Sequence, residues 1–440
     1  MIRSGTLNSR AGRARRAGPA AFRALAGATM AALAGLAVSL AAGPVPALAA
    51  QHQGGPAASH SRAVGTGQPM ATGRAGPGVS WAHVAVGSYH TCGIRTDGTL
   101  WCWGFNDYGQ LGLGNHANQD RPQQVTTPAA GGWASVTAGI YYTCATRTDG
   151  TVWCWGYNGQ GQVGIGDESS QDRPRQVTTP ARGGWTSVTA SGDATCATRT
   201  GGTLWCWGYN FYGQLGLGNH TNQDRPQQVT TPAAGGWTSV SAGGEHSCAT
   251  RTGGTLWCWG YNDVGQLGVG SRTAQDLPRQ VATPATGGWT SVTASYVHTC
   301  ATRTGGTLWC WGWGWYGQLG LGSHTNQDRP QQVTTPAAGG WTGMTALGYA
   351  HTCATRTGGT LWCWGYNAAG QLGLGGDTDQ DLPRQVTTPA AGGWAAVSAT
   401  FEHTCATRAD GTLWCWGKND FGELGIGGDT DQQLPRQVTG

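Results

Sequence analysis

The chain is poor in charged residues and has almost no lysine. Aspartate, glutamate, lysine and arginine make up 11% of its 440 residues, and lysine occurs once, at Lys418. The formal net charge is +4, but residues 1–49 contain six arginines and no acidic residue, so residues 50–440 are close to −2. Binding to nucleic acid depends on clustered basic side chains. We find no such cluster and expect no nucleic-acid partner.

Motifs for metal binding and catalysis are also missing. The absence of any C-x-x-C pair argues against a structural zinc site. There is no G-x-S-x-G segment and no unique set of serine, histidine and acid, so no hydrolase site can be named. The acidic residues 377–381, with Asp429 and Asp431, lack the glycine and distal glutamate of an EF-hand loop, which leaves calcium only as an alternative. We predict no cofactor, no metal site and no enzymatic activity.

No apolar stretch is long enough to be an ordinary transmembrane helix. The longest, residues 24–42, is short and interrupted by glycine. It follows an arginine-rich start and precedes Ala47-Leu48-Ala49, a small-x-small cleavage pattern, so we expect residues 1–49 to be a secretory signal peptide. A retained membrane anchor is the alternative. We expect residues 50–80, rich in Gly, Ala, Pro and Ser, to form a flexible linker, and the mature protein to be secreted and extracellular.

Glycine and tryptophan, by contrast, are abundant and recur at fixed spacing. Seven units follow one another at intervals of 52 residues, once of 53, and fill residues 81–440. The units begin at Trp81, Trp133, Trp185, Trp237, Trp289, Trp341 and Trp394. A period of this length is typical of propellers and other repeat architectures.

Each unit is expected to contain four short strands. In the second unit we place them at 133–138, 143–148, 151–156 and 175–178. In the third strand, tryptophans alternate with Val152 and Cys154, so both of its faces are apolar and both must be covered. The predicted fold class is all-β: a seven-bladed β-propeller with four antiparallel strands per blade, and with the small residues of the first strand near the axis. If each fourth strand joined the next blade, residues 437–438 would complete the first blade and close the ring.

A hairpin with two opposed cysteines recurs in every unit. In the first unit it spans residues 91–104, and Asp97-Gly98 is a strong turn signal. Cys92 and Cys102 lie at equal distance from Asp97, so they should face each other on neighbouring strands at a separation that a disulfide spans. One disulfide per blade is therefore predicted, in keeping with an oxidising compartment. The pairs are Cys92–Cys102, Cys144–Cys154, Cys196–Cys206, Cys248–Cys258, Cys300–Cys310, Cys353–Cys363 and Cys405–Cys415.

The repeated pattern H-T-C-A-T-R-x-x-G-T-L-W-C-W-G-x-N-x-x-G-Q-L-G-x-G resembles the repeat of the regulator of chromosome condensation family. The resemblance covers residues 81–440 and implies a seven-bladed propeller. The founding member is a nuclear exchange factor for a small GTPase and binds chromatin. This chain departs from it by its signal peptide, its cysteines and its lack of basic loops. It is more similar to the secreted bacterial members of the family, one of which is a β-lactamase inhibitor.

Differences between the units collect on one rim of the expected propeller. The turn after the first strand and the loop after the third lie at the same end of a blade, and both vary, whereas the opposite end barely does. Aromatic and acidic residues are enriched there, which suits a binding face; neutral drift at tolerant loop tips is the alternative. The candidate binding residues are Tyr89, Tyr108, Ile140, Tyr141, Phe211, Tyr212, Glu245, Tyr296, Trp313, Trp315, Tyr316, Tyr349, Phe401, Glu402 and Phe421.

Histidine precedes the first cysteine of the hairpin in five units. These residues are His90, His246, His298, His351 and His403. Equivalent residues on separate blades are too far apart to share one ion, so we expect a structural role in which the imidazole bonds a loop backbone. A metal-binding or catalytic role is the alternative.

We therefore predict a secreted, monomeric, non-enzymatic propeller that captures a protein partner through its variable rim, with Trp313, Trp315 and Tyr316 as the central anchor. Exposed aromatic rings also stack on sugars, so a carbohydrate-binding module is the second hypothesis. A hydrolase with its site at the axial opening is the third. The identity of the partner cannot be deduced from the sequence.

Overall fold

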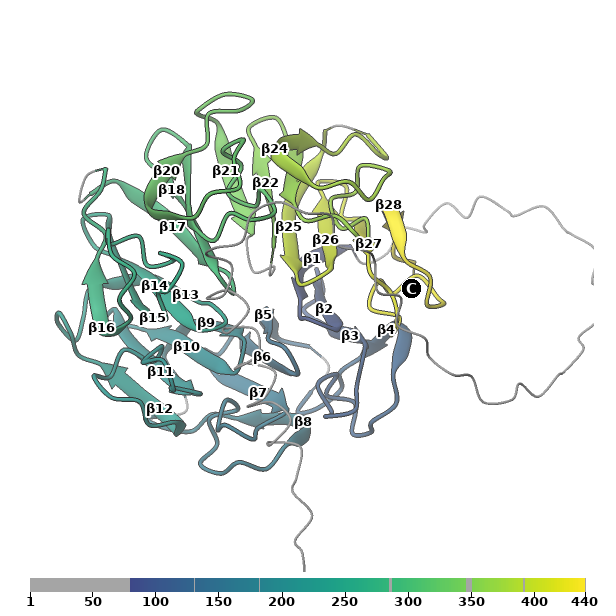
Figure 1. Cartoon of the computed structure of the whole chain (residues 1–440). Helices are drawn as coiled ribbons and strands as arrows, with labels where there is room; N and C mark the ends of the chain where they lie inside the picture. Colours follow the sequence, from purple (N-terminus) through teal and green to yellow (C-terminus); the bar gives the residue numbers. More distant parts are fainter. Residues whose placement is uncertain are drawn as a thin grey trace, which may run out of the picture. The chain divides into compact units, whose positions relative to one another are not determined.

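The computed structural model describes residues 80–129, 131–181, 183–284, 287–345, 350–390 and 392–439. Within these ranges, seven four-stranded antiparallel sheets stand around a common axis, as Figure 1 shows. The predicted all-β seven-bladed propeller is confirmed. The predicted signal peptide, and the linker up to residue 79, lie outside the described residues.

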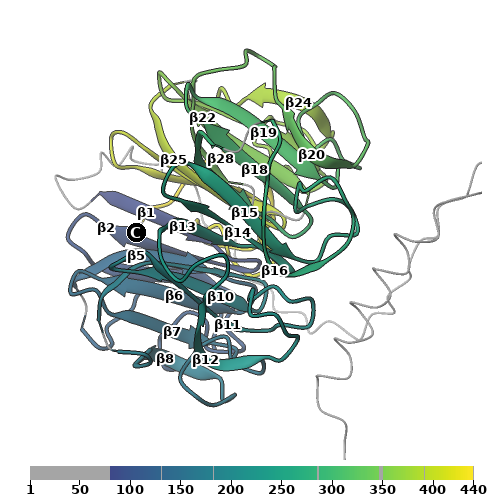
Figure 2. The same ribbon diagram turned by 90° about the vertical axis from the view of Figure 1, so that its left-hand side faces the viewer.

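Four classes of strand repeat around the ring, and Figure 2 shows β5 to β8 in order from the axis outward. The inner strands are β1 (Trp81–Val86), β5 (Trp133–Ala138), β9 (Trp185–Ser191), β13 (Trp237–Ala242), β17 (Trp289–Ala294), β21 (Trp341–Thr345) and β25 (Trp394–Thr400). The second strands are β2 (His90–Arg95), β6 (Tyr142–Arg147), β10 (Ala194–Arg199), β14 (His246–Arg251), β18 (His298–Arg303), β22 (His351–Arg356) and β26 (His403–Arg408). The third strands are β3 (Leu100–Gly104), β7 (Val152–Gly156), β11 (Thr203–Gly208), β15 (Thr255–Gly260), β19 (Thr307–Gly312), β23 (Thr360–Gly365) and β27 (Leu413–Gly417). The outer strands are β4 (Gln119–Gln124), β8 (Gln171–Gln176), β12 (Gln223–Val229), β16 (Gln275–Gln280), β20 (Gln327–Gln332), β24 (Gln380–Gln385) and β28 (Gln432–Gln437).

The outer strand begins earlier than predicted. In the second blade it runs from Gln171 to Gln176, not from 175 to 178, because Gln171 pairs with Gly156 across a register shift between Cys154 and Gly156. The bulge allows the strand to continue past the point where the simple alternation of β7 ends.

The two cysteines of each hairpin face each other as predicted. Cys92 pairs with Cys102 in the register of β2 and β3, and the same pairing holds in all seven blades. The Cα atoms of the pairs are 4.1–4.2 Å apart. All fourteen cysteines are fully buried, so each disulfide is part of the core between two blades.

Ring closure differs from the prediction. The last strand, β28, pairs with β27 and completes the seventh blade, whereas the first blade already has its own outer strand in β4. Every blade is thus built from four consecutive strands. The prediction that residues 437–438 complete the first blade was wrong, because no strand position in the first sheet is vacant.

One backbone carbonyl joins each pair of neighbouring blades. The carbonyl of Gln110 in the first blade accepts hydrogen bonds from Thr143 Oγ1 (2.8 Å) and Trp155 Nε1 (2.9 Å) of the second. The same joint occurs at the carbonyls of Gln162, Gln214, Gln266, Gln318 and Gln371. The seventh copy closes the ring: the Glu423 carbonyl accepts from Thr91 and Trp103 of the first blade, at 2.8 and 2.9 Å.

The five repeated histidines reinforce these joints. His90 Nε2 lies 2.8 Å from Thr143 Oγ1, and His246, His298, His351 and His403 make the equivalent contact with the next blade. Because the threonine hydroxyl already donates to the Gln110 carbonyl, the imidazole must donate its Nε2 proton. The structural role is as predicted, although the partner is a hydroxyl and not a loop backbone.

The other two units use different residues at this position. Tyr142 donates its hydroxyl proton to the Ala194 carbonyl at 2.6 Å, and its oxygen lies 3.0 Å from Thr195 Oγ1, so it also joins two blades. Ala194 has no polar side chain and makes no such bond through its side chain.

Burial lowers the pKa of all five imidazoles to about 3, so they are neutral in the folded protein.

Removing one disulfide should weaken the propeller without changing its fold. The double variant Cys248→Ala/Cys258→Ala should lose about 2–3 kcal/mol of unfolding free energy, because a covalently closed loop restricts the unfolded chain. Urea titration measures the loss, and circular dichroism checks the fold. The same change at Cys196 and Cys206 should have a similar effect, because the geometry repeats. Wild-type protein that reacted with a thiol reagent before reduction would contradict the pairing.

His246→Tyr should make the protein less sensitive to acid. A buried neutral imidazole takes up its proton only on unfolding, so it costs stability increasingly as the pH falls from about 6.5 towards 3. Tyr142 is the natural precedent for tyrosine at this position. Relative to wild type, the variant should therefore gain about 1.4 kcal/mol of unfolding free energy per pH unit below about pH 6. Urea titrations at about pH 7.5, 6 and 5 measure this difference.

The control for this experiment is His83→Tyr, because His83 is exposed on β1. It should follow the pH dependence of the wild type. If His246→Tyr and wild type lost stability in parallel as the pH fell, the imidazole would not be held neutral in the folded protein.

Candidate functional site

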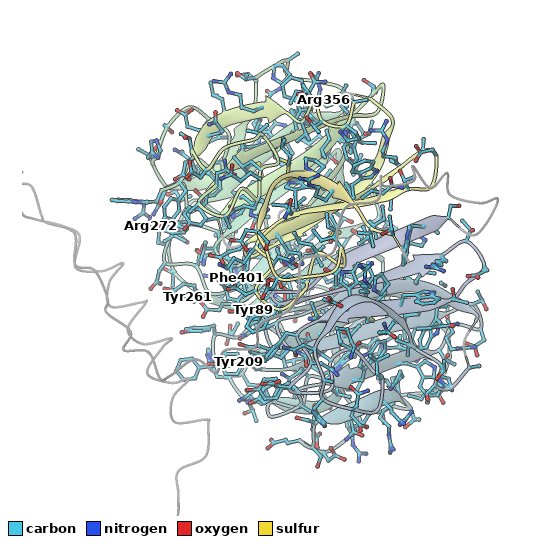
Figure 3. The ribbon with its side chains drawn as sticks, turned by 90° about the vertical axis from the view of Figure 1, so that its right-hand side faces the viewer. Tyr89, Tyr209, Tyr261, Arg272, Arg356 and Phe401 are labelled. Carbon is cyan, nitrogen blue, oxygen red and sulfur yellow. A yellow bond between two sulfur atoms is a disulfide. The ribbon has the colours of Figure 1, made fainter. Side chains whose placement is uncertain are left out.

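The turns after the inner strands and the loops after the third strands meet on one rim, as predicted. In the first blade the amide of Phe105, just after β3, donates to the carbonyl of Tyr89, just before β2, at 2.9 Å. The equivalent hydrogen bond occurs in all seven blades, and the last joins Lys418 to Glu402. We call these paired segments the variable rim. Figure 3 shows Tyr89, Tyr209, Tyr261 and Phe401 gathered towards this face.

The largest aromatic group of the rim extends over the seventh, first and second blades. Tyr89 stacks on Tyr141 with ring centroids 5.5 Å apart, and it also contacts Phe401 and Phe421. Tyr296 of the fifth blade reaches the same group through Phe401, at 5.3 Å. The remaining members are Phe105, Tyr108 and Tyr157. Packed rings of this kind present a large surface with little conformational freedom to lose on binding.

Two smaller aromatic groups complete the rim. Over the third and fourth blades, Tyr212 contacts Tyr209, Phe211 and Tyr261. Over the fifth and sixth blades, Tyr316 lies between its neighbours Trp313 and Tyr366.

The three residues predicted as the central anchor do not form one cluster. Trp313 packs on Tyr316 with ring centroids 5.4 Å apart. Trp315 is 60% exposed, and its ring has no aromatic neighbour among the described residues. Phe211, at 62% exposure, is the other prominent ring. The structure places the most connected aromatic residues around Tyr89 instead, while the role of Trp313 and Trp315 in binding stays a prediction.

The remaining candidates have varied positions. Ile140 is partly buried, and its amide donates to the Gly192 carbonyl of the next blade at 3.4 Å. Glu245 and Glu402 are also partly buried. Tyr349 lies outside the described residues.

The sequence analysis named Trp313 but missed the other aromatic residues at the first position of the loop after the third strand. Phe105, Tyr157, Tyr209, Tyr261 and Tyr366 occupy this position, and all contact other rings of the rim. Six of the seven units have an aromatic residue there, so the position looked like part of the repeated framework. The recurrence of an aromatic residue immediately after W-C-W-G is the sequence signal that could have identified these rim residues.

The variable rim is acidic as well as aromatic. Lys418 and Arg272 are the two lysine or arginine residues in its described segments, and the ammonium of Lys418 is already paired with Asp420 (3.1 Å) and Asp431 (3.4 Å). The carboxylates of the rim are more numerous, and they are those of Asp107, Asp167, Glu168, Asp193, Glu245, Asp263, Asp377, Asp379, Glu402, Asp420, Glu423, Asp429 and Asp431. A face with this imbalance attracts cationic partners and repels anionic ones.

Two of these carboxylic acids hold their protons unusually tightly. Burial, followed by the charge of Asp263, raises the pKa of Glu245 to about 7. Burial likewise raises the pKa of Glu423 to about 7. Glu423 occupies a position that is glutamine in the other six units, and its Oε2 accepts from the Phe421 amide (2.8 Å) as Gln110 Oε1 does from Tyr108 (3.0 Å).

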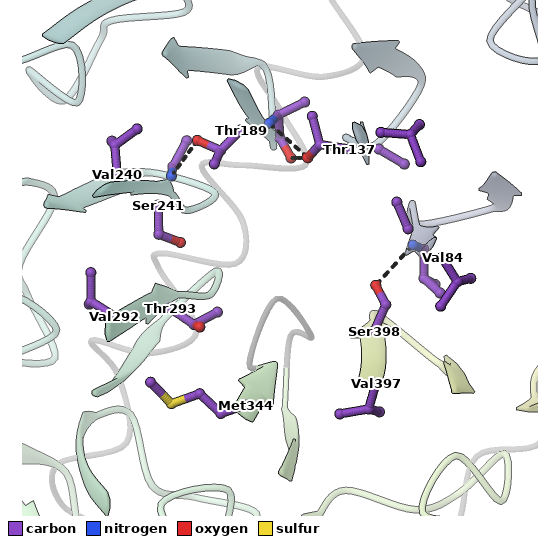
Figure 4. Close-up of a pocket in the computed structure, with 16 residues that line it drawn as sticks. Val84, Thr137, Thr189, Val240, Ser241, Val292, Thr293, Met344, Val397 and Ser398 are labelled. Carbon is purple, nitrogen blue, oxygen red and sulfur yellow. Dashed lines mark hydrogen bonds between the residues drawn. The ribbon is translucent and has the colours of Figure 1, made fainter. Parts of the chain in front are cut away.

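The axial channel offers different chemistry. Its volume is about 300 Å³, and the small residues of the inner strands line it as predicted, as Figure 4 shows. No titratable side chain is among these lining residues. Their hydroxyls bond the neighbouring strand: Ser398 Oγ accepts from the Val86 amide and Ser241 Oγ from the Ala294 amide. The channel therefore gives no support to a hydrolase at the axial opening.

The described residues contain neither a cluster of metal ligands nor a membrane-spanning helix. No group of three or more His, Cys, Asp or Glu side chains is arranged to hold a metal ion there. In the same ranges, no helix has the length and apolar character needed to cross a membrane.

Comparison with known proteins gives consistent results. The chain is 31% identical over 357 residues to the Ultraviolet-B receptor UVR8 of Arabidopsis thaliana, which covers 81% of each protein. It is 28% identical over 310 residues to the human E3 ubiquitin-protein ligase HERC2, covering 68% of this chain but only 6% of the ligase. The crystal structure of Prp20p from Saccharomyces cerevisiae matches with a TM-score of 0.68 and 20% identity, over 78% of this chain and 86% of Prp20p.

The model of the regulator of chromosome condensation (RCC1) repeat matches nearly all of the propeller. The matched residues are 97–146, 149–198, 201–250, 253–302, 305–355, 358–407 and 410–440. Together with the similarity to UVR8, these matches show that the chain belongs to the family of RCC1-repeat proteins.

Proposed function

We propose that this protein is a secreted, non-enzymatic binding protein that captures a protein partner through its variable rim. The observation that carries the proposal is the concentration of aromatic rings and carboxylates on one face of an otherwise repeated scaffold. Aromatic residues dominate the energetics of protein interfaces, and charged groups beside them select the partner. We further propose that the protein works as a monomer, free of cofactors.

Relatives with known partners agree with a binding role. Prp20p has binding properties towards Gsp1p and histones. A second crystal structure shows yeast RCC1 (Prp20) bound to Kap60. Those partners belong to the yeast protein. The seven disulfides of the present chain fit an oxidising, extracellular environment, so we infer that its partner is extracellular.

A carbohydrate ligand is the second candidate. Phe211 and Trp315 are 62% and 60% exposed, and exposed rings of this kind provide flat surfaces on which sugar rings can stack. A glycan array distinguishes the two candidates, because a protein-specific rim would leave the array blank.

Removing the two most exposed rings should abolish capture without affecting folding. Phe211→Ala/Trp315→Ala deletes aromatic surface from the rim, and a hot-spot loss of this kind weakens binding by about thirtyfold or more. Wild-type and variant protein are used as baits in culture medium, and the proteins retained specifically by the wild type are identified by mass spectrometry.

The matched control removes exposed apolar side chains from outer strands. Leu277→Ala/Leu434→Ala changes residues that are 37% and 40% exposed but belong to the outer strands β16 and β28, not to the turns and loops of the rim. The control should retain the same proteins as the wild type, and both variants should unfold at the wild-type temperature. Equal retention by the rim variant and the wild type would refute a binding role for these two rings.

A further inference from the structure

A small pocket opens on the variable rim between the fifth, sixth and seventh blades. Its volume is about 180 Å³. Tyr316 and Tyr366 come from the loops after β19 and β23, and Phe401 and Glu402 come from the turn between β25 and β26. Ala350, just before β22, completes the lining. Three aromatic rings and one carboxylate thus surround a space smaller than an ordinary pocket for a drug-sized molecule.

The walls of the pocket are held in place from several sides. The rings of Tyr316 and Tyr366 pack with their centroids 4.9 Å apart. Phe401 is fixed by Tyr296 on one side and Tyr89 on the other, at 5.3 and 6.4 Å.

Backbone hydrogen bonds hold the segments that carry these rings. The Tyr366 amide donates to the Ala350 carbonyl, and the Lys418 amide donates to the Glu402 carbonyl, both at 2.9 Å. The pocket is therefore formed before any ligand arrives, which limits the entropy lost on binding.

The carboxylate of Glu402 has no cationic partner among the described residues. The backbone amide of Lys418 donates to the backbone carbonyl of Glu402. The ammonium of Lys418, however, pairs with Asp420 and Asp431 and not with the Glu402 carboxylate. The pKa of Tyr366, which lines the pocket, is raised first by burial and next by the negative charge of Glu402. The charge of Glu402 is therefore felt inside the pocket. Aromatic faces and a carboxylate both attract cations, and the two effects reinforce each other where water is partly excluded.

We infer that this pocket receives the cationic end of a lysine or arginine side chain that the protein partner presents. The inference rests on the proposed function of the variable rim, and it adds the chemistry of the group that is recognised. An apolar side chain would leave the Glu402 carboxylate desolvated without compensation, and an acidic one would be repelled. The size of the pocket suits the end of one side chain and not a whole small molecule.

The test uses single amino-acid probes and needs no knowledge of the partner. The probes are Nα-acetyl-lysine methylamide and Nα-acetyl-arginine methylamide, whose side chains keep their charge. They are titrated into the mature protein, and their binding is followed by saturation-transfer NMR. The neutral isostere N-acetyl-norleucine methylamide serves as the comparison. At least one cationic probe should bind with a Kd near the millimolar range, and norleucine should bind about tenfold more weakly.

Variants of the pocket separate charge from shape. Glu402→Gln keeps the volume but removes the charge, and Phe401→Leu removes one aromatic face; each should weaken the binding of the cationic probe by about tenfold. Glu168→Gln makes the same chemical change at an exposed residue outside the pocket and should have no effect. Equal affinity for norleucine and the cationic probes, or unchanged binding by Glu402→Gln, would overturn the inference.

A small free ammonium ion is the competing ligand, and tetramethylammonium represents it in the test. Binding of this ion more tightly than both amino-acid probes would assign the pocket to a small free ammonium ligand and overturn the role of a partner's side chain. The two proposals fail separately. If Phe211→Ala/Trp315→Ala loses the partner but no cationic probe binds, the rim function stands and the pocket assignment falls. If a probe binds through Glu402 but the wild type retains no protein from the culture medium, the proposed capture function falls.

Discussion

The propeller depends on one shared carbonyl at each junction between blades. Each of these carbonyls accepts a hydroxyl and an indole N–H from the second and third strands of the next blade. Leaving either buried donor unpaired would cost about 1–3 kcal/mol, so the two strands must keep their register. The disulfide lies across the same two strands and fixes that register. The covalent bond within each hairpin and the polar joint between blades therefore enforce the same geometry, and the seventh joint closes the circle without any special device.

The residues that hold the ring together are not those of the rim, which explains why the rim can vary. The joints use backbone carbonyls together with strand residues such as Thr143 and Trp155, and the inner strands use their own hydroxyls beside the channel. The side chains of the turns, such as Phe401 and Glu402, are not needed for either purpose. Aromatic and acidic residues can therefore accumulate there without weakening the ring, and the surface charge they create is opposite to that of a nucleic-acid-binding protein.

Most of the fold could be predicted from the sequence because its determinants are local. Cys92, Cys102 and the Asp97-Gly98 turn lie within one hairpin, and the period of the tryptophans sets the number of blades. The misses have two different causes. The start of β8 depends on a bulge at Gly156, and the contact between Tyr296 and Phe401 joins the fifth blade to the seventh. The bulge is local, but the alternation of residues along β7 does not mark it. The contact between blades depends on the curvature of the whole ring, which a comparison of one unit with another does not contain.

Every disulfide of this protein joins cysteines ten residues apart within a single blade. None links two blades, so the peptide backbone is the sole covalent connection between them in the described residues. The connecting segments pass over the surface, where Pro128 and Ala129 are exposed. A protease that cut one such connection would leave two fragments held together by the junctions alone, so the integrity of a cleaved ring rests on hydrogen bonds and packing despite the seven disulfides.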